Sequence, residues 1–414
     1  MNLKTRVELS TMMFLEFFIW GAWYVTMSTY LTKIGFEGTD VGNAYSTVAW
    51  AAIVSPFFVG MVADRFFAAQ RVLGVMHLLG GLLLYWASTI VTPGEFFWVL
   101  LGYALCYTPT LALTNAIAFN QMKNPEKEFP PIRVLGTLGW IVAGLAIAHI
   151  LTRFIAKDVE ATAIPMRMAA IASFVLGVYS FFLPDTPPKS VGKKVTVGEI
   201  LGLDALKLMK DRSFAVFMIG SLLVCIPLAF YYSFANAFFN EVGMEGAAGK
   251  MSFGQMSEVV FMLLMPFFLG RLGIKKTLLL GMLAWFVRYL FFGYGNMGTL
   301  AFMFYLGILL HGICYDFFFV TGQIYVEKEA PKAIQASAQG FFALVSYGVG
   351  MVIGNNIAGL VVNHYQVMDA AGKVSGHLWR PIWIVPAVMA AVVVVLFALF
   401  FREPAKSRNN AAAQ

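Results

Sequence analysis

The feature that most constrains this chain is a series of long apolar runs along its 414 residues. A helix needs about 20 mostly apolar residues to cross the hydrocarbon core of a bilayer. With 59% hydrophobic and 12% charged residues, the chain has too few polar side chains for a water-soluble surface. The runs lack the alternation of an outer-membrane barrel. The sequence therefore predicts an all-α polytopic membrane protein with twelve transmembrane helices, over residues 9–32, 41–63, 72–91, 95–121, 132–153, 164–184, 213–239, 251–270, 276–294, 298–325, 333–363 and 379–401.

One long polar interval divides these runs into six and six. We expect an N-terminal six-helix bundle over residues 1–184, a cytoplasmic linker over 185–212, a C-terminal six-helix bundle over 213–401 and a cytoplasmic tail over 402–414. With the N-terminus inside, 20 of the 29 Lys and Arg residues fall in cytoplasmic segments and 7 fall on the opposite side. By the positive-inside rule, both termini are cytoplasmic. Because topology explains the net charge of +7, we expect no nucleic-acid partner.

A short motif follows the second run, where the chain reads Gly60-Met-Val-Ala-Asp64-Arg65. It resembles the G-x-x-x-D-R signature of the major facilitator superfamily of transporters. A glycine there lets two helices approach closely. The Asp64 carboxylate could pair with Arg65 and face a neighbouring helix N-terminus, which would hold one conformation. An ordinary charged turn is the alternative.

Ionisable residues inside the apolar runs are the main functional candidates, because a charge in a span is costly. They are Glu16, Arg133, Glu258, Arg288 and Asp316. The three cysteines lie in apolar runs without a CxxC spacing, so we expect neither a disulfide nor a metal site.

The fifth run places Arg133, Thr137 and Trp140 at positions i, i+4 and i+7. They therefore share one helix face. A cation, a hydroxyl and an indole on one stripe could bind a flat polar solute. Alternatively, Arg133 reaches the cytoplasmic interface and Trp140 only packs.

The eighth run places Gln255 and Glu258 on one face, at i and i+3. An amide both donates and accepts hydrogen bonds, as recognition of hydroxyls or a base edge requires. A low-dielectric interior favours the neutral form of a carboxyl group, so Glu258 could load and release a proton. A structural pair with Arg288 is the alternative.

Two further runs carry aromatic and amide side chains. His311 and Tyr315 share a face at i, i+4, and Asp316 follows one position round. Aromatic faces can stack on a planar base or a sugar ring. Asp316 is a second candidate for the group that carries the coupling proton, or it holds this helix to another one. In the seventh run, Tyr232 and Asn236 step by four along one side.

Together these stretches resemble the nucleoside:H⁺ symporter family of the major facilitator superfamily, which is found in bacterial inner membranes. The resemblance runs from the first span to the eleventh. The matching segments are residues 14–23, 63–65, 130–137, 201–205, 255–258, 266–269, 273–275, 315–318, 326–329 and 336–340.

The resemblance implies two six-helix bundles and proton-driven nucleoside import by alternating access. It implies that Asp316 takes part in proton coupling or in the conformational change. It also implies that the substrate site includes Arg133, Thr137, Trp140, Gln255, Glu258, His311 and Tyr315. Members of that family tend to have Gln where Glu16 stands and Tyr where His311 stands. Glu16 is thus an extra carboxyl that could share the proton relay, and the preferred nucleoside stays open.

We therefore expect a secondary transporter and not an enzyme, with the proton as coupling ion and no other cofactor. Its partners would be a nucleoside, protons and the lipid bilayer, and we expect a monomer. The alternative is a proton-coupled transporter of a sugar or another small polar solute.

Overall fold

The computed structural model describes residues 1–58, 67–188 and 203–403. Within these parts the chain is almost entirely helical and forms two compact units. The first unit is drawn from Met1–Phe36, Asn43–Val195 and Glu245–Ser252. The second is drawn from Glu37–Gly42, Thr196–Met244 and Phe253–Gln414.

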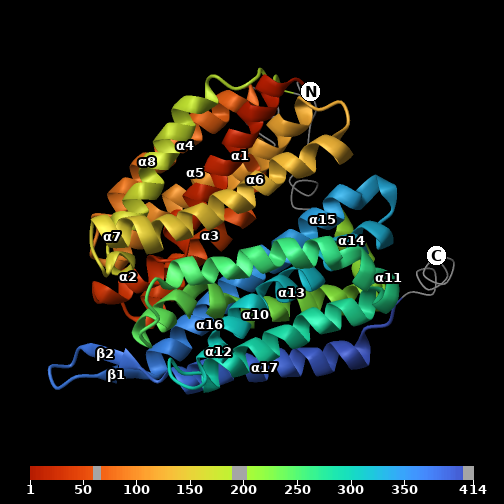
Figure 1. Ribbon diagram of the computed structural model, residues 1–414. Coiled ribbons are helices and arrows are strands. Elements are labelled where there is room, and N and C mark those ends of the chain that lie inside the picture. The colour runs from red at the N-terminus through yellow and green to blue at the C-terminus, as the bar shows by residue number, and fades with distance from the viewer. Residues whose placement is uncertain (59–66, 189–202, 404–414) are drawn as a thin grey trace. The chain divides into compact units, whose positions relative to one another are not determined.

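The described residues in the first half of the chain are mostly helical (Figure 1). Their elements are α1 (Leu3–Tyr24), α2 (Met27–Lys33), α3 (Gly38–Phe58), α4 (Ala69–Ala87), α5 (Pro93–Asn120), α6 (Pro125–Leu145), the π-helical η2 (Ala146–Leu151), α7 (Thr152–Phe154), the 3₁₀ turn η3 (Val159–Ala161) and α8 (Ile164–Ser180).

The second half adds more helices and one antiparallel hairpin. Its elements are η4 (Leu203–Lys210), α10 (Arg212–Glu241), α11 (Ala247–Tyr294), α12 (Ala301–Leu309), α13 (His311–Tyr315), the π-helical η5 (Asp316–Val320), α14 (Thr321–Glu329), η6 (Lys332–Ile334), α15 (Gln335–Ala343), the π-helical η7 (Leu344–Gly350), α16 (Met351–His364), β1 (Gln366–Met368), β2 (Val374–His377) and α17 (Trp379–Phe400).

Most of each predicted span coincides with helix where the structure describes it. The ends of the third and sixth spans, residues 88–91 and 181–184, lie beyond the ends of helices α4 and α8. The eighth and ninth spans both lie in α11, which is broken at Gly273. There φ is +70°, a conformation that favours glycine because it has no Cβ. Seven helices of the described residues are long and apolar enough, by length and composition, to cross a membrane, and α11 is one of them.

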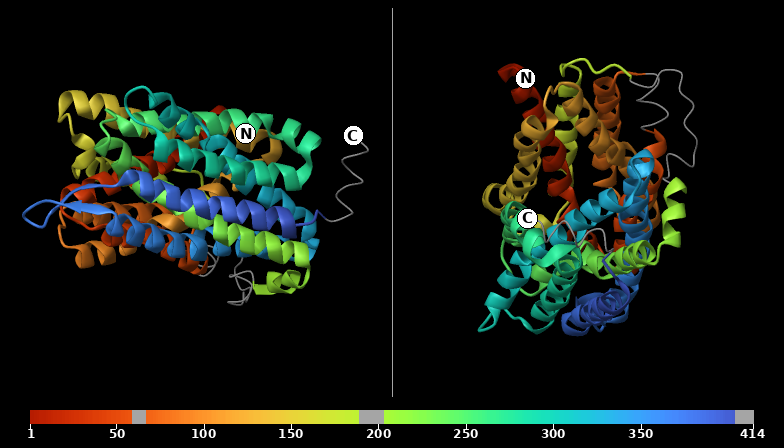
Figure 2. Two further views of the ribbon diagram at one scale, coloured as in Figure 1. Left: turned by 90° about the horizontal axis from the view of Figure 1, so that it is seen from below. Right: turned by 90° about the vertical axis from the view of Figure 1, so that its right-hand side faces the viewer.

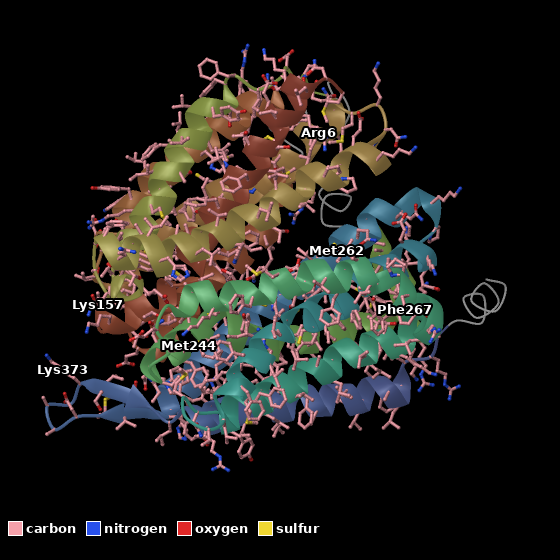
Figure 3. The ribbon with its side chains drawn as sticks, viewed as in Figure 1. Arg6, Lys157, Met244, Met262, Phe267 and Lys373 are labelled. Atoms are coloured by element: carbon pink, nitrogen blue, oxygen red, sulfur yellow. The ribbon has the colours of Figure 1, made fainter. Side chains whose placement is uncertain are left out.

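In the first unit, α1 packs against α6 and α8, and α4 packs against α5 and α8. Small residues allow the close approach of α1 and α6. A Cβ on Gly139 would overlap with the Phe14 carbonyl oxygen, and one on Gly21 would lie 3.0 Å from Trp140 Cγ. Glycine at such positions is typical of helix packing in membranes. Arg6 and Lys157 lie at opposite ends of this unit (Figure 3).

In the second unit, α10 packs against α16 and α17 (Figure 2). Pro227 lies inside α10, and its carbonyl oxygen accepts a hydrogen bond of 2.6 Å from the Tyr289 hydroxyl. The ammonium group of Lys275 donates to two carbonyl oxygens at the end of α17. Phe267 and Lys373 lie at opposite ends of this unit (Figure 3). Gly60, Asp64 and Arg65 lie outside the described residues, so the predicted signature stays a prediction.

Candidate functional site

Glu16 lies at the centre of a buried hydrogen-bond network in the first unit. Its side chain is 0% exposed. Oε1 accepts a hydrogen bond of 2.6 Å from the Thr110 hydroxyl, and Oε2 lies 2.8 Å from His77 Nε2. The other ring nitrogen of His77 lies 3.0 Å from Ser173 Oγ. The network therefore joins α1, α4, α5 and α8.

His77 connects Glu16 and Ser173. Its ring nitrogens face Glu16 Oε2 and Ser173 Oγ, and Ser173 Oγ also donates to the His77 carbonyl oxygen at 2.9 Å. These contacts satisfy both ring nitrogens and one carboxyl oxygen in an apolar interior, which reduces the cost of burying them. His77 lies 61 residues from Glu16 along the chain, and nothing in the sequence indicates that the two side chains meet.

The predicted stripe on α6 faces α1. The guanidinium Cζ of Arg133 lies 4.2 Å from the Phe17 ring centroid. The Trp140 indole meets the Trp20 indole edge-on, with ring centroids 5.5 Å apart. Arg133, Thr137 and Trp140 are all half-buried. Arg133 and Trp140 thus contact aromatic rings of α1, which are Phe17 and Trp20. The alternative in which Trp140 packs against a neighbouring helix therefore describes one of its contacts.

In the second unit, Arg288, His311 and Glu258 form a row. Arg288 is 0% exposed, and its Cζ lies 3.3 Å from the Tyr231 ring centroid. Arg288 Nη1 lies 3.3 Å from His311 Nδ1, and His311 Nε2 lies 3.9 Å from Glu258 Oε2. His311 therefore lies between Arg288 and Glu258. The alternative from the sequence was a direct pair of Glu258 with Arg288.

Aromatic rings surround His311. Its ring centroid lies 6.3 Å from that of Tyr232, edge-on, and 6.0 Å from that of Tyr315, stacked. The Tyr347 hydroxyl donates to the Tyr315 hydroxyl at 2.9 Å. The structure thus brings together the rings of Tyr232, His311 and Tyr315. Tyr347, on η7, was missed, because nothing in its own segment marks it as polar or functional.

The amide candidates lie on two helices of this unit. Asn236 is buried on α10, and its Oδ1 accepts a hydrogen bond of 3.2 Å from Asn240 Nδ2. Gln255 is half-buried on α11, three residues before Glu258.

Asp316 is the first residue of the π-helical turn η5 and is 0% exposed. Neither carboxyl oxygen accepts a hydrogen bond from any residue that the structure describes. A carboxyl group without partners is costly to bury, so Asp316 is a candidate for a functional role. Single π-helical turns are frequent at functional sites.

Comparisons with known proteins agree with this fold. The model of the family described as nucleoside H⁺ symporter matches residues 1–406. The putative nucleoside transporter YegT of Escherichia coli K12 is 47% identical over 97% of this chain and 95% of its own. Xanthosine permease of the same organism is 33% identical over 99% of both chains.

A crystal structure of the nucleoside transporter NupG superposes with a TM-score of 0.86 at 30% identity, covering 98% of this chain and 100% of that one. The likeness extends over both units and confirms the predicted twelve-helix major facilitator fold. The matched proteins are transporters and not enzymes. The chain therefore belongs to the nucleoside H⁺ symporter family.

Proposed function

We propose that the chain imports nucleosides with protons across a bacterial inner membrane by alternating access. The observation that carries the proposal is Asp316, a fully buried carboxyl group without a hydrogen-bond partner among the described residues. Intramembrane carboxyl groups in such settings mark proton pathways. Membership of the nucleoside H⁺ symporter family supports the same function.

In this proposal Glu258 is the group that exchanges the coupling proton. Its side chain is 20% exposed, whereas Asp316 is fully buried, so Glu258 is the one that water can reach. Proton loading of Glu258 favours substrate binding, and its neutral form removes a desolvation cost when the loaded carrier reorients. Asp316 and Glu16 are the two further proton-linked carboxyl groups.

The substrate is recognised by hydrogen-bonding and aromatic side chains. Guanidinium, hydroxyl and amide groups would bind the ribose hydroxyls and the base edge, and rings would stack on the base. The half-burial of most of these side chains supports a contact with a polar solute. The proposed substrate-binding residues are Arg133, Thr137, Trp140, Tyr232, Asn236, Gln255, Glu258, His311 and Tyr315.

The topology in this proposal has both termini in the cytoplasm and a monomer as the working unit. The positions of Arg6 and Lys157 at opposite ends of the first unit support opposite membrane sides for them. The Gly60, Asp64 and Arg65 motif would stabilise one conformation of the transport cycle.

The test is uptake of labelled nucleosides into membrane vesicles with an imposed pH gradient. We expect the wild-type protein to accumulate nucleoside, and we expect an uncoupler to abolish this accumulation. The Glu258→Gln variant should not accumulate nucleoside, although its counterflow without a gradient should continue. Glu241→Gln, which changes an exposed carboxyl at the end of α10, is the matched control. Uptake indifferent to the uncoupler would remove proton coupling, and full accumulation by Glu258→Gln would remove the role of Glu258.

Substrate class is tested by competition. Unlabelled purine and pyrimidine nucleosides, free bases and free ribose are added to the same uptake assay. We expect nucleosides to compete strongly and ribose weakly. Competition by ribose as strong as by nucleosides would favour a sugar transporter instead.

A further inference from the structure

Arg288 is a buried cation with very few hydrogen bonds. Its Nη1 contacts His311, whereas Nε and Nη2 have no hydrogen-bond partner among the residues that the structure describes. Its stabilisation comes in part from the Tyr231 ring, above which the guanidinium lies at 3.3 Å. A charge retained at such a cost needs an explanation that packing does not give.

The contact between Arg288 and His311 determines the tautomer of the imidazole. A guanidinium only donates hydrogen bonds, so His311 Nδ1 must accept and carries no proton. The proton of the neutral ring is therefore on Nε2. That is the nitrogen nearest to Glu258, at 3.9 Å from Oε2.

We infer that Arg288 is a positioning residue for proton coupling: it holds His311 with its Nε2–H directed at Glu258 and so sets the pH at which Glu258 is loaded. The inference rests on the proposed function of Glu258. It gives His311 a role beyond the predicted substrate contact, and it gives a role to Arg288, which the proposed function does not use.

The distance of 3.9 Å is too long for a hydrogen bond. If His311 Nε2 and Glu258 Oε2 approached each other by about 1 Å, a hydrogen bond would form between them. A side-chain movement can supply this change in distance. The charged carboxylate gains from this donor and from the guanidinium charge behind it, whereas the protonated carboxyl gains much less. Arg288 and His311 together therefore favour release of the proton from Glu258.

Other titratable groups of the described residues lie beside this row. Their charge depends on pH, whereas the charge of Arg288 does not. These groups are Tyr231 and Tyr232 on α10, Tyr289 on α11, Cys314, Tyr315 and Asp316 on α13 and η5, and Tyr347 on η7.

The test compares the pH profile of gradient-driven uptake in three arginine variants. Arg288→Gln removes the charge, so Glu258 is loaded at higher pH and the profile moves in the alkaline direction by about one pH unit. Arg288→Lys keeps the positive charge and a group that only donates hydrogen bonds, so its uptake should keep the wild-type pH profile. Arg380→Gln is the matched control, because Arg380 is an exposed arginine 4.5 Å from the Tyr294 ring in the same unit.

Counterflow without a pH gradient shows which variants fold and bind substrate. A counterflow-competent Arg288→Gln with the wild-type pH profile would overturn the inference. If Arg288→Gln does not fold, His311→Met decides in its place: it removes the donor to Glu258, so its profile should also move in the alkaline direction, and an unmoved profile would count against the inference.

The Glu258→Gln variant separates the two proposals. If Glu258→Gln loses gradient-driven accumulation and the Arg288 and His311 variants keep the wild-type profile, only the inference fails. If Glu258→Gln accumulates nucleoside fully, the proposed role of Glu258 fails, and the inference fails with it.

Discussion

Glu16 Oε2 and His77 Nε2 lie 2.8 Å apart in the interior of the first unit, with both side chains almost fully buried. Thr110 contacts the other carboxyl oxygen of Glu16, and Ser173 contacts the other ring nitrogen of His77. The polar atoms of a buried carboxyl group are thus satisfied among apolar helices.

We predict that Glu16→Gln is far less destabilising than Glu16→Ala. The amide oxygen can accept from Thr110 and the amide nitrogen can donate to His77, so stability should fall by less than about 1 kcal/mol. Alanine leaves two buried groups unpaired and should cost about 3 kcal/mol. Thermal unfolding of the purified protein in detergent measures both; equal losses would contradict the network.

Glu16→Gln also tests the proposed proton role of Glu16, because the amide cannot exchange the coupling proton. Counterflow should continue while gradient-driven accumulation falls. Unchanged accumulation would restrict Glu16 to a structural role.

Asp316→Asn should be tolerated structurally and should uncouple transport. Asparagine resembles the protonated carboxyl that the buried, unpaired site requires, so the melting temperature should not decrease. Because the amide cannot release a proton, accumulation driven by a pH gradient should disappear while counterflow persists. Asp158→Asn, at an exposed position between η2 and α8, is the control. Accumulation at the wild-type level would exclude Asp316 from coupling.

Arg133→Lys should weaken nucleoside binding although it keeps the charge. The planar guanidinium lies 4.2 Å from the Phe17 ring centroid, and lysine has neither the plane nor the forked donors. We expect KM for uptake to rise roughly tenfold, or about 1.4 kcal/mol. Initial rates against nucleoside concentration give KM. Arg167→Lys, an exposed arginine 6.0 Å from the Tyr85 ring, should leave KM unchanged. Similar KM values for both variants would argue against a substrate role.

Lys275→Met should destabilise the end of α17 without changing substrate affinity. The ammonium group donates to the carbonyl oxygens of Ala398 at 2.9 Å and Phe401 at 2.6 Å, which the helix leaves unpaired. Loss of these charge-assisted bonds should cost about 1–2 kcal/mol. Unfolding in detergent measures this, with the exposed neighbour Lys276→Met as control. Equal stability of the two variants would show that the cap contributes little.

The helices could be predicted from the sequence because a span is a local property, set by about 20 apolar residues and interrupted by polar turns. The break at Gly273 was located in the same way, between two predicted spans. Faces such as Arg133 to Trp140 followed from helical periodicity. These predictions needed no knowledge of neighbouring helices.

The pairs between helices could not be predicted. His77 is 61 residues from Glu16, and His311 is 23 residues from Arg288. Which face of one helix meets which face of another depends on packing of the whole unit. For the same reason the π-helical turns were missed, since hydrogen-bond register responds to tertiary contacts.

The π-helical turns η2, η5 and η7 have a consequence for how this chain is aligned and engineered. A π turn accommodates one extra residue within an otherwise α-helical path. Deleting one residue there converts the π-helical turn into regular α-helix, and the side chains on either side keep their orientation. The same deletion in a regular stretch would rotate everything beyond it by about 100°. A single-residue gap at residues 316–320 is therefore compatible with unchanged orientation of all later side chains.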